Sequence, residues 1–235
     1  MINNKQVLCV IPARGGSKGI PLKNMKKING KTLIQLVADC AKQVHFIDKI
    51  VLSTDNEIIA KEGKDCGIEV PFYRPPELSG DRVSDFQVLE HVLKTLEKND
   101  NNKYEYIVML QPTSPLRTPE NVEGCIKKIE NENWDSIWTV SKNDSKNHPL
   151  KQLIKDSSDK LSFYDIQGSK IIARQELDTL FYRNGVAYVI TRDCLLNQKT
   201  IMGKNMGGYL INSYQISIDS LDDLELAEYY MNKKL

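Results

Sequence analysis

The sequence has no long apolar run. Its first such stretch covers only Val7 to Ile11, and no later segment approaches the roughly 18 apolar residues that a membrane-spanning helix needs. The polar residues before Val7, and the shortness of the run itself, do not resemble an export signal. We therefore expect a cytoplasmic protein that is neither exported by this route nor embedded in a membrane.

Cysteine is scarce, and its spacing suggests no pairing. The five cysteines are odd in number, and none forms a C-x-x-C pair: Cys9, Cys40, Cys66, Cys125 and Cys194. This pattern argues against a disulfide framework and against a zinc site, and it favours free thiols in a reducing compartment.

Net charge is also nearly absent, because 32 basic residues are balanced by 31 acidic ones to give +1. Attraction of the whole molecule to nucleic acid or to a membrane surface requires a basic field, so neither partner is expected. Anionic ligands can still bind, but only through basic side chains that are placed locally.

The first 140 residues alternate strand-like and helix-like patterns. The continuous apolar run at Val7 to Ile11 is typical of a strand buried on both faces. The rhythm predicts an α/β fold in which helices cover a mostly parallel sheet, with ligands beyond the carboxyl ends of the strands. We expect strands over 7–11, 49–53, 106–110, 136–140 and 186–190, and helices over 32–43, 56–66, 84–96, 119–129 and 221–231.

The alternation stops between residues 148 and 182. This stretch is polar, contains only short β-like pieces at 160–164 and 170–173, and has no clear helical pattern. It reads as an insertion, within a single domain spanning residues 1–235, that needs another surface to pack against.

A loop rich in glycine and basic residues follows the first expected strand, from Pro12 to Asn24. Its glycines let backbone N–H groups approach an anion closely, and its basic side chains add positive charge: Arg14, Lys18 and Lys23. It is not a Walker A loop, because Gly19 is followed by Ile20 and Pro21 instead of Lys-Ser/Thr and a helix. The alternative is a solvated turn without a ligand.

A second polar loop, from Leu110 to Arg117, follows the strand expected at 106–110. Two prolines fix its path, and it presents an amide, two hydroxyls and a guanidinium, which suit a polyhydroxylated ligand. Taken alone, a proline-rich turn with helix-capping hydroxyls explains the same residues.

These loops belong to a longer series of motifs that occur in a fixed order. After the first loop come Ser53-Thr54-Asp55, Arg74-Pro75-Pro76-Glu77-Leu78-x-x-Asp81, Gln111-Pro-Thr-Ser-Pro-Leu-Arg117, His148-Pro149-Leu150-Lys151, Arg174-Gln175, Asn184-Gly185-x-x-Tyr188 and Ser217-Ile218-Asp219. Together they resemble the acylneuraminate cytidylyltransferases, also called CMP-sialic acid synthetases. The resemblance implies a three-layer fold of the nucleotide-diphospho-sugar-transferase type, and transfer of CMP from CTP to an acidic nine-carbon sugar with release of pyrophosphate.

The resemblance also implies roles for individual positions. The first loop would surround the CTP triphosphate, and Lys23 would neutralise the reacting phosphate. Arg74 would face the cytosine beside backbone groups near Val83 and Met109. The nucleotide-binding positions implied are Arg14, Gly15, Ser17, Lys23, Asn24, Arg74, Val83 and Met109, and the catalytic ones are Arg14, Lys23 and Asp219.

The same resemblance makes residues 148–182 a dimerisation arm of a homodimer. Lys151 and Arg174 would reach the neighbouring subunit's site and pair with the sugar carboxylate. Asp219 would bind Mg²⁺, the expected cofactor. The sugar-binding positions implied are Gln111, Ser114, Asn184, Tyr188, Lys151 and Arg174.

Two positions depart from the family pattern. Ser217 stands where an Asp-x-Asp pair would place a second metal-binding carboxylate, and Asp85 stands where the family has a hydroxyl near the nucleotide. Two alternatives therefore stay open: a CMP-Kdo synthetase, which shares the first loop, and a non-catalytic nucleotide-binding protein on the same fold.

Overall fold

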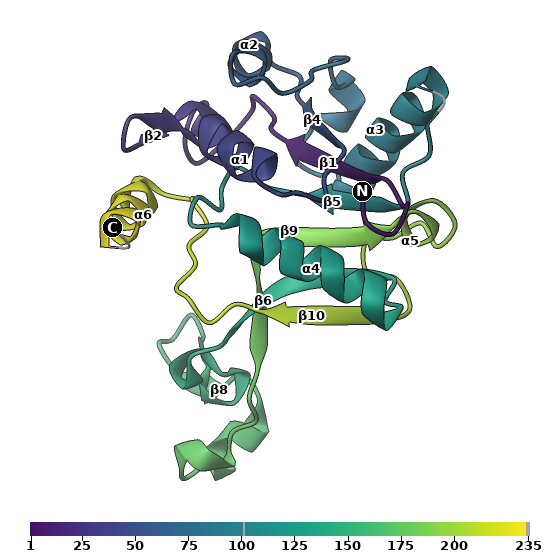
Figure 1. Cartoon of the computed structure of the whole chain (residues 1–235). Coiled ribbons are helices and arrows are strands. Elements are labelled where there is room, and N and C mark those ends of the chain that lie inside the picture. The colour runs from purple at the N-terminus through teal and green to yellow at the C-terminus, as the bar shows by residue number, and fades with distance from the viewer. Residues whose placement is uncertain (101, 234–235) are drawn as a thin grey trace.

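The computed structural model describes residues 1–100 and 102–233, and six of its strands form one central sheet in the order β10-β6-β9-β5-β1-β4 (Figure 1). β1 pairs in parallel with β4 and β5, and β10 pairs in parallel with β6. β9 runs antiparallel between β5 and β6, so the sheet is mostly parallel, as predicted. The strands are β1 (Val7–Pro12), β4 (Lys49–Ser53), β5 (Tyr106–Met109), β6 (Ser136–Lys142), β9 (Phe181–Thr191) and β10 (Met206–Leu210).

Alternate residues of β1 enter two separate cores. Val7, Cys9 and Ile11 pack with residues from α1, α2 and α4 on one face of the sheet. Leu8 and Val10 pack with residues from α3 and α5 on the other. This two-sided burial explains the continuous apolar run and confirms the three-layer arrangement. The helices are α1 (Leu33–Lys42), α2 (Glu57–Asp65), α3 (Asp85–Asp100), α4 (Pro119–Glu132), α5 (Arg192–Leu196) and α6 (Leu221–Lys233).

Side-chain caps fix where the first two helices begin. The Thr32 hydroxyl accepts a hydrogen bond from the Gln35 amide at 3.0 Å at the start of α1. Asn56 Oδ1 accepts from the amides of Ile58 and Ile59 at the start of α2. Gly67 lies past the end of α2 with a φ of +70°, a conformation that glycine adopts without strain. Both predicted helices are confirmed to within a residue or two.

Other boundaries differ from the predictions. Residues 170–173 form no strand: a 3₁₀ helix (Ile166–Lys170) ends there and the chain continues without a ladder partner. β10 was not predicted, because its sequence Met-Gly-Gly-Tyr-Leu has low strand propensity and gains its order from pairing with β6. Two short hairpins, β2 (Lys27–Ile28) with β3 (Lys31–Thr32) and β7 (Leu153–Lys155) with β8 (Leu161–Phe163), lie outside the central sheet.

The segment 148–182 extends from one end of the sheet, away from the helices (Figure 1). It holds the β7–β8 hairpin and short 3₁₀ turns, and several of its large apolar side chains are exposed, including Leu161 at 58% and Phe163 at 40%. Among the described residues, no helix has the combination of length and apolar character that crossing a bilayer demands.

Candidate active site

Two adjoining cavities lie at the carboxyl ends of β1, β4 and β5. The first cavity has a volume of about 500 Å³, and the Pro12–Asn24 loop, Arg74, Asp81 and Val83 contribute to its walls. The second cavity, of about 450 Å³, lies toward β9 and the chain before α6. Asp85, Gln111 and Asp219 line both cavities, so the two spaces meet at these three side chains.

The glycine-rich loop is folded tightly against its neighbours. The Gly15 amide donates to Asp55 Oδ1 at 2.8 Å, and a Cβ at this position would lie 2.7 Å from the Asn56 side chain, so only glycine fits. Asn24 is buried and its side-chain amide donates to the Arg14 carbonyl at 3.1 Å. These contacts hold the loop across the carboxyl end of β1, where its basic side chains face the first cavity.

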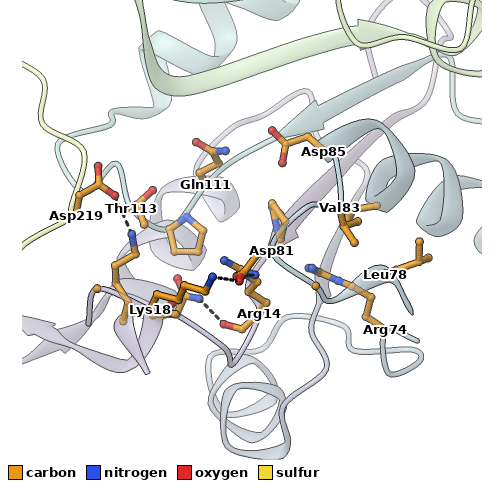
Figure 2. A pocket seen from close by; sticks show the side chains of 18 residues that line it. Arg14, Lys18, Arg74, Leu78, Asp81, Val83, Asp85, Gln111, Thr113 and Asp219 are labelled. Carbon is orange, nitrogen blue, oxygen red and sulfur yellow. Dashed lines mark hydrogen bonds and ion pairs between the residues drawn. The ribbon is translucent and has the colours of Figure 1, made fainter. Parts of the chain in front are cut away.

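The basic side chains of this loop are paired with carboxylates (Figure 2). Arg14 and Lys18 contact the two oxygens of Asp81 at 2.7 and 2.5 Å. Lys18 and Arg14 hold the pKa of Asp81 below its usual value by hydrogen bonding and by their charge. Lys23 Nζ lies 3.0 Å from Asp219 Oδ1. The first cavity thus contains three cations matched by carboxylate oxygens, and phosphate oxygens would bind the same cations.

Arg74 is held beneath the first cavity by the end of β4. Its Nε donates to Ser53 Oγ at 3.0 Å and its Nη2 to the Ser53 carbonyl at 2.6 Å, and only 5% of the residue is exposed. Burial lowers the pKa of the guanidinium, which nevertheless remains charged at neutral pH. The Ser53-Thr54-Asp55 motif therefore orients Arg74 and braces the glycine-rich loop through Asp55.

An irregularity in β9 shapes the second cavity. The register between β6 and β9 shifts after Trp138, and the chain near Gly185, with a φ of +75°, bends out of the ladder. Ser114 Oγ donates to the Gly185 carbonyl at 2.9 Å. The Asn184 side chain is likewise committed to the protein, since its amide donates to Ser141 and its oxygen accepts from the Val186 amide.

Two aromatic contacts support the wall beyond this bend. Tyr188 packs edge-on against Trp138 with ring centroids 5.1 Å apart, and the Arg183 guanidinium lies 6.0 Å from the Trp138 ring centre. Among the described residues lining the second cavity, Arg183 is the one with a cationic side chain.

Sequence comparison identifies the family. A family model described as "Cytidylyltransferase" matches residues 8–234. The chain belongs to the cytidylyltransferase family. It is 32% identical over 220 residues to an N-acylneuraminate cytidylyltransferase from Streptococcus agalactiae serotype V, covering 92% of this chain and 51% of that protein. The chain thus spans about half the length of this relative.

Other relatives match this cytidylyltransferase-family chain from end to end. A CMP-N,N'-diacetyllegionaminic acid synthase from Campylobacter jejuni is 29% identical over 230 residues, covering 97% of this chain and 96% of that protein. The solved structure of a CMP:2-keto-3-deoxy-manno-octonic acid synthetase complexed with CTP matches with a TM-score of 0.74 at 19% identity, covering 98% of this chain and 100% of that one. At this identity the structural match establishes the fold alone.

Most of the positions singled out from the sequence lie around the two cavities of this cytidylyltransferase-family fold. The first cavity is lined by Arg14, Ser17, Lys23, Asn24, Arg74 and Val83, the second by Asn184 and Tyr188, and both by Gln111 and Asp219. Gly15 helps to hold the loop through the hydrogen bond from its amide to Asp55.

Gly15 and four other predicted positions line neither cavity. Met109 is fully buried within β5, which is paired on both sides, and Ser114 is buried against Gly185. Lys151 and Arg174 lie on the 148–182 segment, outside both cavities of their own chain.

Sequence reasoning gave no site role to Asp81, Tyr182, Arg183 or Gln215, which also line the cavities. A signal existed for two of them: Asp81 ends the quoted Arg74 motif, and Arg183 directly precedes Asn184.

The carboxylates of the site fit a metal that is shared with a ligand. Among the described residues, no group of three or more His, Cys, Asp or Glu side chains could enclose an ion. Asp219 is 75% exposed at the junction of the cavities, whereas Asp223 is occupied in accepting hydrogen bonds from the amides of Asp219 and Ser220. An exposed carboxylate that contacts one lysine, as Asp219 does, suits Mg²⁺, which commonly binds through one or two carboxylates together with substrate phosphates and water.

Proposed function

We propose that this chain transfers CMP from CTP to the anomeric hydroxyl of a nonulosonic acid, a sialic, legionaminic or related sugar, and releases pyrophosphate. The observation that carries the proposal is the pair of cavities joined at Asp85, Gln111 and Asp219, one lined by the basic glycine loop and the other by polar and aromatic groups. The family membership and the names of the relatives support the same reaction. Free cysteines throughout the chain suit the reducing cytoplasm, where we place the activity.

In the reaction, the anomeric oxygen attacks the α-phosphorus of CTP, and the bond from that phosphorus to the bridging oxygen breaks. Pyrophosphate leaves with the electron pair, and the hydroxyl proton passes to solvent. Catalysis of such in-line transfers depends mainly on positioning and on charge stabilisation. The triphosphate would take the places of Asp81 and Asp219 on Arg14, Lys18 and Lys23.

Mg²⁺ is part of this proposal. Asp219, with the α-phosphate beside it, would hold the ion, and Ser217 next to it offers a hydroxyl instead of a second carboxylate. When bound, the ion would supply positive charge to the phosphates and lower the pKa of a bound hydroxyl. The chain's own contribution is to place Lys23 in the first cavity next to Asp219, which lies where the two cavities meet.

We also propose a homodimer that is formed through the segment 148–182. A β-hairpin with exposed apolar side chains is stable when a partner covers them, and a second copy of the same arm would do so around a two-fold axis. The sugar carboxylate needs cations, and Lys151 and Arg174 lie outside the two site cavities of their own chain, where a neighbouring subunit could use them.

The reaction is tested by measuring pyrophosphate release from CTP with Neu5Ac, legionaminic acid, pseudaminic acid and Kdo in parallel. We expect turnover with at least one nine-carbon acid and little with Kdo. Turnover with Kdo alone would show a CMP-Kdo synthetase instead. Tight CTP binding without turnover on any acid would favour the non-catalytic alternative.

The dimer is tested by subunit exchange. Mixing Lys23→Ala with Arg174→Ala protein should restore activity, because one of the two sites in each heterodimer then has both residues. The matched control mixes Lys23→Ala with Asp219→Ala: both residues act within one chain, so no rescue is expected. A monomer in sedimentation, or no rescue after confirmed exchange, contradicts the shared site.

A further inference from the structure

Asp85 differs from the other carboxylates of the site. It is the first residue of α3, it is half-buried, and it lines both cavities. Asp81 and Asp219 each contact basic side chains of the glycine loop. Within residues 1–100 and 102–233, by contrast, no donor forms a hydrogen bond or ion pair with the Asp85 carboxylate.

A half-buried carboxylate without a donor is costly for the free protein. Burial raises the pKa of Asp85, although the charges of Arg183 and Arg74 oppose this shift from a distance. An ionised carboxylate accepts hydrogen bonds and donates none, so a ligand group that satisfies it must be a hydroxyl, an N–H or a cation. Phosphates and the carboxylate of an acidic sugar cannot be seated against it.

Asp85 lines the second cavity together with Arg183 and Tyr188. Tyr188 and Arg183 belong to the second cavity only. In Figure 2, Asp85 lies on the opposite side of Gln111 from Asp219, and no dashed contact joins it to Arg14 or Lys18.

We propose that Asp85 is a sugar-specificity residue, whose carboxylate accepts a hydrogen bond from a hydroxyl or amide N–H of the acidic sugar beside Tyr188 and Arg183. The inference rests on the proposed function, and it specifies which part of the sugar the protein recognises. The sugar's carboxylate then faces away from Asp85. Sugars that lack a donor at the position next to Asp85 leave the carboxylate unpaired and bind poorly.

The test uses the variants Asp85→Asn and Asp85→Ser, both of which have side chains that suit the start of a helix. Hydrogen bonds to charged groups are the stronger ones, so we expect kcat/KM for the sugar to fall about ten- to a hundred-fold. The Kd of CTP, measured by calorimetry without sugar, should stay within about two-fold. Glu90→Gln is the matched control, because it removes a carboxylate on the same helix that lines neither cavity and pairs with Lys94.

A second arm identifies the ligand group. Sugar analogues that lack one hydroxyl or amide N–H at a time are compared in the wild type and in Asp85→Ser. On the analogue without the relevant donor, kcat/KM of the wild type should fall by the same factor that Asp85→Ser loses on the complete sugar. The kcat/KM of Asp85→Ser should not fall further on that analogue. Losses that add for every analogue would overturn the contact.

The failure of this proposal can be distinguished from the failure of the proposed function. Sugar binding is also measured by calorimetry on protein loaded with a non-reactive CTP analogue, so the result does not depend on turnover. The Asp85 assignment alone is contradicted if the sugar Kd of Asp85→Ser is unchanged, or if its CTP Kd rises while sugar binding stays normal. Absence of sugar binding to the wild type overturns both.

Discussion

Lys23 provides the most direct test of the proposed phosphate site. Its ammonium group lies 3.0 Å from Asp219 and is 19% exposed, on a 3₁₀ turn (Lys23–Met25) that begins after the left-handed residue Leu22. Lys23→Ala removes this cation without touching the apolar cores. We expect turnover to fall far more than stability.

The two effects differ in magnitude for physical reasons. Asp219 is 75% exposed, and ion pairs with such an exposed partner contribute about 0–1 kcal/mol to folding, so the melting temperature should move little. Removing one preorganised group that stabilises charge in a transition state costs about 3–4 kcal/mol. Since every 1.4 kcal/mol is tenfold, kcat should drop by roughly a hundred- to a thousand-fold.

The assay is pyrophosphate release at saturating CTP and sugar, with a thermal melt of the same samples. Lys27→Ala is the control, because Lys27 is an exposed cation four residues along that lines neither cavity. Lys23→Arg should recover part of the rate, since it restores the charge with a different shape. A Lys23→Ala enzyme with kcat within about threefold of wild type would show that the loop does not stabilise the reacting phosphate.

Three further expectations concern the same cavity. Asp81→Asn removes a carboxylate that competes with phosphate for Arg14 and Lys18, so KM for CTP should fall by about two- to five-fold; a raised KM would mean that Asp81 instead orients these cations for the ligand. CTP should be preferred over UTP by roughly ten- to a hundred-fold in kcat/KM, because uracil has no amino group to donate to acceptors that suit cytosine; equal rates would contradict a base site at Arg74. Asp219→Asn should raise the Mg²⁺ concentration needed for half-maximal rate, whereas an unchanged metal titration would remove Asp219 from the ion's ligands.

The spacing of apolar residues predicted most strands and helices, because it reflects which faces of each element are buried. The apolar run at β1 and the helix-like patterns over 32–43 and 56–66 are local signals, and the elements they predicted are present. β10 and the antiparallel direction of β9 depend on partners far along the chain, and no local pattern encodes them. Residues 170–173 have strand-like composition but find no neighbouring strand.

The site was predictable where motifs place side chains at the ends of strands. The basic loop and Gln111 follow that rule, whereas Arg74 follows no strand and was predicted from the family resemblance alone. Sequence alone could not show that Ser114 is turned inward to support Gly185, or that Asp85 lies where two cavities meet, because both facts depend on how separate loops pack.

The position of β9 bears on how the chain folds during synthesis. β4, β1 and β5 come from the first 109 residues and can pair as soon as they emerge, but β6 joins this group only through β9, which ends at Thr191. Until β9 has been made, β5 has no strand partner on that side, and its edge stays open. The exposed arm leaves the ribosome immediately before the strand that closes this edge. In the proposed homodimer, pairing of two nascent chains through their arms would compete in time with completion of the sheet.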